Sequence, residues 1–187
     1  VSVDYNYPFR INNTNHEIMT KMLNLYDQTL QFYIKPSELD EFGKIVQKMY
    51  DANAIALFPS IGNFFMAGVF RQNMLEIGKN VIVEKQIFYQ TKVAETLKKR
   101  DLAIVISYAN RTPHVEDFIR VMNKNQVTTV LISSTKESEL SNLLIIISIL
   151  HRMKIQKKRL PLFLQELITV LIRLSLCMLF NKDYEKN

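Results

Sequence analysis

Short apolar runs alternate with longer segments of helical spacing from residue 54 onward. We predict strands in these runs, at residues 54–58, 81–83, 102–106, 127–132 and 144–149. Helices are predicted between them, at residues 62–77, 85–100, 113–125 and 136–143. Apolar runs without polar alternation are typical of strands that are covered on both faces, and helical crossovers connect parallel strands. The alternation therefore predicts an α/β fold with a parallel sheet.

Two helical segments precede the first predicted strand, one at residues 15–34 and one that starts after Pro36. A chain of 187 residues, 48% of them hydrophobic, is long enough for one sizeable core and short for two domains. We predict a flavodoxin-like, three-layer αβα sandwich with a five-stranded parallel sheet and two N-terminal helices. Residues 1–13 are expected to form a linker and residues 14–187 a single domain.

The stretch 103–115, A-I-V-I-S-Y-A-N-R-T-P-H-V, indicates one strand–turn–helix unit in detail. The apolar run ends at Ser107, and Thr112 followed by Pro113 is typical of a helix start. Such a turn places hydroxyls and backbone N–H groups at the carboxyl end of a strand and the positive end of a helix. Open α/β sheets bind anions there, phosphates above all. The unit therefore predicts a phosphorylated small-molecule ligand.

The net charge of +6 is unevenly distributed. From residue 143 onward eight Lys and Arg face three acidic residues, so the rest of the chain is close to neutral. This distribution argues against a nucleic-acid-binding body. The lone Cys177 permits no disulfide within one chain, which favours a reducing, cytoplasmic compartment, and we expect it to be a small core residue. No residues have the spacing of metal ligands, so no metal ion or other cofactor is expected.

Several strings resemble the sugar isomerase (SIS) domain of RpiR-type transcriptional regulators. They are L-E-I-G-K-N-V at 75–81, A-I-V-I-S-Y at 103–108 and L-I-S-S-T-K-E-S-E-L-S at 131–141. The opening D-Y-N-Y-P-F at 4–9 is similar to the linker that follows the DNA-binding head of these regulators. The resemblance implies a phosphosugar-sensing effector domain of a sugar-metabolism regulator. It would contact DNA only through a head that is absent from this chain.

In the family the phosphosugar site lies on three turns. The first reads Gly-x-Gly-Ser-Ser, where residues 59–63 here read Pro-Ser-Ile-Gly-Asn. The second reads Ser-x-Ser-Gly-x-Thr, where residues 107–112 keep only the first Ser and the Thr. The candidate ligand-binding residues are Ser60, Asn63, Ser107, Asn110, Arg111, Thr112, Ser133, Ser134 and Thr135. These departures leave two interpretations open: a retuned anion site, or a decayed site whose hydroxyls only cap helices.

The resemblance leaves rival functions open as well. A phosphosugar isomerase needs an acid/base group, for which Glu84, Glu95, His114 and His16 are the candidates. None lies in a setting that the sequence marks as catalytic, so the chain is not expected to be an enzyme. A third reading is a dimerisation module with a decayed ligand site. The family implies a homodimer or higher homo-oligomer, and no membrane partner is expected.

Residues 143–178 depart from the family pattern. Family members continue with Leu-Ala-Asp-Tyr and alternating Leu and Tyr, which codons for residues 143–150 can encode when read one base out of frame. We hypothesise a shifted reading frame between about residue 143 and about residue 178, which sequencing of the encoding DNA tests. The apolar run at 160–180 approaches membrane-spanning length. Gln165, Glu166 and Arg173 interrupt it, so a buried or dimer-forming helix is expected.

Overall fold

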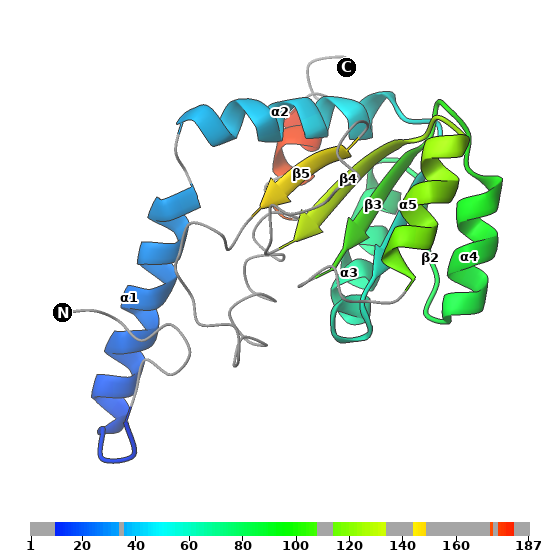
Figure 1. The fold of residues 1–187 in the computed structure, drawn as a ribbon. Coiled ribbons are helices and arrows are strands. Elements are labelled where there is room, and N and C mark those ends of the chain that lie inside the picture. The colour runs from blue at the N-terminus through cyan, green and yellow to red at the C-terminus, as the bar shows by residue number, and fades with distance from the viewer. Residues whose placement is uncertain are drawn as a thin grey trace.

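The computed structural model describes residues 10–33, 36–107, 114–133, 144–148, 173 and 176–181. In chain order the elements are α1 (Asn15–Tyr33), α2 (Pro36–Asp51), β1 (Ile55–Pro59), the 3-10 turn η1 (Ile61–Asn63), α3 (Phe64–Glu76), β2 (Val81–Val83), α4 (Ile87–Thr96), β3 (Leu102–Ile106), α5 (Val115–Lys124), β4 (Thr128–Ser133) and β5 (Leu144–Ser148). The strands form one parallel sheet in the order β2-β1-β3-β4-β5 (Figure 1). This flavodoxin-like order confirms the predicted fold class.

Two separate apolar clusters cover the two faces of the sheet. Successive strand residues point to opposite faces, so Leu57 lies in one cluster and its neighbour Phe58 in the other. The first cluster joins the sheet to α2, α3 and the helical residues 176–181. The second joins the sheet to α4 and α5. The chain thus forms the three layers that the unalternating apolar runs predict.

The two N-terminal helices differ in how closely they pack against the sheet. Helix α2 contributes Ile45, Val46 and Met49 to the first cluster, whereas α1 extends away from the sheet (Figure 1). Cys177 was expected in the core, and this expectation is wrong because its side chain is exposed. Its neighbours on the helical segment, Leu176 and Leu179, are the residues that turn toward the sheet.

Helix boundaries follow the prediction with local differences. Helix α3 ends at Glu76, and the expected terminating glycine, Gly78, follows with a φ of 71°, the left-handed conformation that glycine adopts without strain. Helix α5 begins at Val115, two residues later than predicted, because His114 supplies the carbonyl that accepts the first helical hydrogen bond, from the Phe118 N–H at 3.0 Å. The predicted helix at 136–143 lies outside the described residues. No helix in the described ranges is both long and apolar enough to cross a membrane.

Candidate functional site

The connections that leave β1 and β3 run to opposite faces of the sheet. β1 leads through η1 into α3, which packs in the first apolar cluster. β3 is followed by α5, which packs in the second. Because β1 and β3 are neighbours in the sheet, their connections diverge from a common point at the carboxyl ends of the two strands. Open α/β sheets bind ligands in the crevice at such a switch point.

Serines occupy matching positions at this edge. The register pairs Pro59 with Ile106 and Ile106 with Ile132, so the next residues along the three strands are Ser60, Ser107 and Ser133. Two backbone hydrogen bonds continue the ladder, from the Ser60 N–H to the Ile106 carbonyl at 3.2 Å and from the Ser107 N–H to the Ile132 carbonyl at 3.0 Å.

The row extends to β5. Ser133 pairs in register with Ser148, which ends that strand. The sequence reading did not select Ser148, because the apolar run continues to residue 150 and the strand predicted at 144–149 places this serine inside it. Hydroxyl-bearing residues therefore end four adjacent chain segments at one edge of the sheet.

The turn after β1 is organised by Asn63. Its side chain is 4% exposed, and its Nδ2 donates to Ser60 Oγ at 2.9 Å. Its backbone N–H also donates to the Ser60 carbonyl, at 2.9 Å, which closes the turn η1. Gly62 lies between them, and a Cβ atom added there would meet nothing within 4 Å. The turn therefore has open space directly beside the two candidate side chains.

Three helices begin at this edge without side-chain caps. The N-cap residues of α3, α4 and α5 are Asn63, Gln86 and His114, and none of their side chains makes a capping hydrogen bond. The first turns of α3 and α4 contain no acidic residue, whereas α5 has two. The positive end of α3 is thus uncompensated by side chains on its own first turn, which suits an anionic ligand.

Gln90 connects two turns of the candidate site, and the sequence reading missed it. It is 5% exposed on α4, and its Nε2 donates to the Glu84 carbonyl at 2.8 Å and to the Pro59 carbonyl at 3.4 Å. These bonds join the turns after β2 and β1. The available signal was its spacing: Gln90 lies one helical turn before the buried Ala94, on the face of α4 that meets the sheet.

A cation also lies beside the first turn. Lys85, which follows β2 after Glu84, holds its Nζ 5.8 Å from the centre of the Phe64 ring. Phe64 begins α3 directly after Asn63. The sequence contains no motif around Lys85 that would have selected it, because the contact joins residues from two different connections.

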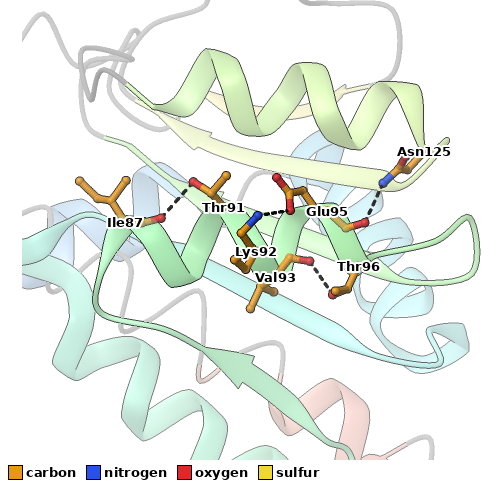
Figure 2. A network of polar contacts seen from close by, with 7 residues as sticks. All are labelled: Ile87, Thr91, Lys92, Val93, Glu95, Thr96 and Asn125. Carbon is orange, nitrogen blue, oxygen red and sulfur yellow. Dashed lines mark hydrogen bonds and ion pairs between the residues drawn. The ribbon is translucent and has the colours of Figure 1, made fainter.

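The acid/base candidates do not all lie at the same edge of the sheet. Glu84 directly follows β2 and His114 directly precedes α5, so both are at the carboxyl edge. Glu95 lies near the far end of α4, where its carbonyl accepts a hydrogen bond from Asn125 Nδ2 at 3.4 Å (Figure 2). The chain after α4 meets the start of β1, since the Asn53 N–H donates to the Arg100 carbonyl.

Glu95 is therefore at the amino edge of the sheet, away from the serines. Its carboxylate pairs instead with Lys92 at 2.8 Å, and both side chains are exposed (Figure 2). His16 is exposed in the first turn of α1, the helix that extends away from the sheet (Figure 1).

The remaining candidate residues of the site lie outside the described residues. They are Asn110, Arg111, Thr112, Ser134 and Thr135. Of the nine candidates, the structure brings Ser60, Asn63, Ser107 and the backbone of Ser133 together at one edge.

Solved structures with a similar fold include both regulators and enzymes. The sugar isomerase domain of an RpiR transcription factor from Sphaerobacter thermophilus has a TM-score of 0.66 and 13% identity, with 89% of each chain covered. The NanR protein of Vibrio vulnificus, complexed with ManNAc-6P, has a TM-score of 0.63 and 16% identity, with 90% of this chain and 69% of that chain covered. The phosphoheptose isomerase GmhA of Neisseria gonorrhoeae has a TM-score of 0.69 and 12% identity, with 89% of this chain and 99% of that chain covered.

These likenesses show a shared fold and leave the activity open, because regulators and isomerases are found among them. No curated protein sequence matches the chain. The family model of the SIS domain matches residues 48–170, a stretch that contains every strand of the sheet and every candidate ligand-binding residue. On that match, the chain belongs to the SIS domain family.

Proposed function

We propose that this SIS domain binds a phosphorylated sugar and acts as the sensing domain of a transcriptional regulator. The observation that carries the proposal is the row of serines at the switch point, where Ser60 and Ser107 are held in register by the β1–β3 ladder. A phosphate offers only acceptor oxygens to a neutral hydroxyl or N–H group. Hydroxyl donors beside an uncapped helix start are what such a ligand requires.

The proposal also assigns five residues beyond the described ranges to the site. Asn110, Arg111 and Thr112 follow Ser107 in the chain, and Ser134 and Thr135 follow Ser133. Arg111 would add a charge-assisted contact to the phosphate. One solved structure with this fold, the NanR protein, is complexed with the sugar phosphate ManNAc-6P.

The proposed regulator would respond through its assembly. A ligand shifts a two-state protein only as far as its affinity differs between the states. We propose a homodimer, with DNA contacted by a head domain outside residues 1–187, and a cytoplasmic location. In a dimer the ligand would change how two attached heads are held.

Thermal unfolding against a panel of sugar phosphates tests the proposal. The panel contains ManNAc-6P, glucose 6-phosphate and fructose 6-phosphate, each beside its unphosphorylated parent. A ligand at about a hundred times its Kd stabilises the fold by roughly 2.7 kcal/mol, which raises the Tm of a domain of this size by about 5–10 °C. A rise with one sugar phosphate and none with its parent supports the proposal. No rise with any sugar phosphate contradicts it and favours a dimerisation module with a decayed site.

A phosphosugar isomerase is the second candidate function. The placement of Glu84 and His114 at the carboxyl edge favours it, because an isomerase needs a proton-transfer group beside the bound sugar. Turnover of an aldose or ketose phosphate that disappears in Glu84→Gln or His114→Ala would establish an enzyme. Glu95→Gln is the matched control, since Glu95 lies at the opposite edge of the sheet and should leave any turnover unchanged.

A further inference from the structure

Asn63 has an unusual position for an asparagine at a helix start. Asparagine is among the preferred N-cap residues because its side-chain oxygen accepts a hydrogen bond from an N–H group of the first helical turn. Asn63 is the N-cap of α3, yet its side chain makes no such bond. It is buried instead with its Nδ2 directed at Ser60 Oγ, 2.9 Å away. The Asn63 side chain therefore stabilises the turn before the helix and does not cap the helix.

We propose that Asn63 is a positioning residue that makes the Ser60 hydroxyl a hydrogen-bond donor for the phosphate of the bound ligand. This inference rests on the proposed function and deepens it. A serine hydroxyl has one proton to donate and lone pairs that accept. Because the Asn63 amide already donates to Ser60 Oγ, the hydroxyl proton is left for another acceptor. A hydrogen bond accepted at the oxygen also polarises the hydroxyl and strengthens it as a donor.

The backbone holds this pair in the place where a donor is useful. The Ser60 N–H is bound to the Ile106 carbonyl, which fixes Ser60 beside the end of β3, and Ser107 follows Ile106. The Asn63 N–H is bound to the Ser60 carbonyl, so the spacing of the two side chains is set by the turn η1. Ser60 is only partly buried and Asn63 almost fully. The hydroxyl is therefore the member of the pair that a ligand reaches.

The arrangement also explains how the turn can work without the serines of the family pattern. Asn63 stands where the pattern has its last Ser, and Ser60 stands at a position that the pattern leaves variable. The Asn63 amide donates its hydrogen bond to the hydroxyl of Ser60, three residues earlier in the chain. Asn63 thus acts on the ligand through Ser60, and Ser60 carries the direct contact.

A double-mutant cycle in phosphate affinity tests the inference. The probe is inorganic phosphate, titrated into the purified chain and followed by 1H–15N NMR. Ser60→Ala and Asn63→Ala should each weaken binding roughly tenfold, as expected for one hydrogen bond to a charged group. The double variant should lose no more than Ser60→Ala alone, because the two residues form one pathway. Asn63→Gly, which keeps a residue accepted at an N-cap and brings no new donor, replaces Asn63→Ala if that variant does not fold.

Three results overturn the inference. A double variant weakened roughly a hundredfold means that the two residues contact phosphate independently. Unchanged affinity in Asn63→Ala means that the amide has no role. Side-chain amide signals of Asn63 that do not move in ligand-free Ser60→Ala mean that the hydrogen bond is absent. In all three cases phosphate binding by the unaltered chain leaves the proposed function standing, whereas absence of phosphate binding there overturns both.

Discussion

Replacing Gln90 by Glu exchanges the side-chain nitrogen for an oxygen and removes the donor that joins two turns of the candidate site. In the structure Nε2 faces the Glu84 carbonyl at 2.8 Å and the Pro59 carbonyl at 3.4 Å, in surroundings that leave the side chain 5% exposed. A carboxylate at this position would direct an acceptor at two acceptors. The substitution keeps the shape of the side chain, so its cost measures the polar contact and not a cavity.

The expected cost follows from these contacts. Leaving buried carbonyls without their donor lowers the free energy of unfolding by about 1–3 kcal/mol, which corresponds to a Tm lower by roughly 2–12 °C. Burial and the facing carbonyl oxygens raise the pKa of the new carboxyl above its value in the unfolded chain. The folded state then binds more protons than the unfolded state, so the loss of stability grows as the pH rises above about 4.3. Below that pH the protonated carboxyl donates to the Glu84 carbonyl and part of the loss is recovered.

Urea unfolding of three proteins at pH 4 and pH 8 checks this reasoning. They are the unaltered chain, Gln90→Glu and the control Gln72→Glu, whose side chain is exposed on α3. The control should stay within about 0.5 kcal/mol of the unaltered chain at both pH values. A loss in Gln90→Glu that is equal at the two pH values, or no greater than that of the control, would refute the assignment of Gln90 as the link between the two turns.

Further predictions follow from single positions. Gly62→Ala should weaken binding of a panel sugar phosphate without lowering the Tm, because its Cβ enters the open space of the first turn, whereas Gly68→Ala on α3 has equal space and should leave binding unchanged. Gln126, with φ 57°, follows α5 in the left-handed conformation, so Gln126→Gly should raise the free energy of unfolding by about 0.5–1 kcal/mol in urea titrations, and a loss would contradict this. The Thr14 N–H donates to the carboxylate of Glu17 and lowers the pKa of that carboxyl. The stabilisation of α1 by this cap is therefore complete above the pKa of the carboxyl in the unfolded chain, and it is lost as the pH falls through the lower pKa of the folded state. An NMR titration of Glu17 with a midpoint at or above the ordinary value would contradict this prediction. Sequencing of the DNA that encodes residues 143–178 should show compensating frame shifts. An unbroken reading frame would contradict the hypothesis of a shifted frame in this segment.

The strands were predictable because burial on both faces leaves a simple signature. Runs such as 102–106 contain no polar residue, and all five residues of β3 are buried. The serine that follows β3 and the one that ends β4 were predictable for the same reason, since each follows an apolar run. The positions of Glu84 and Glu95 at opposite edges follow from chain direction alone: a residue just after a strand lies at the carboxyl edge, and one at the end of the following helix lies at the amino edge.

Features set by contacts across the chain were not predictable in this way. Glutamine is a residue type typical of solvent-facing helix positions. Only the contacts of Gln90 with the carbonyls of Pro59 and Glu84 show its role. The turn η1 replaces the first residues of a predicted helix because the Asn63 side chain turns back to Ser60. Thr14 and Glu17 form a capping box at the start of α1, a pattern that stood in the sequence and was overlooked.

Because the core is divided into two clusters, a ligand at the switch point would couple the two layers of helices. Each cluster ties one layer of helices to its own face of the sheet, and within the described residues no cluster contains helices of both layers. The turn after β1 belongs to one layer, and the helix after β3 belongs to the other. A ligand bound by Ser60 and Ser107 together would connect the two layers at this edge. Local opening of either layer would then require the ligand to dissociate. Binding at this edge would then slow hydrogen exchange in α3 and α5 alike, although the two helices lie on opposite faces of the sheet.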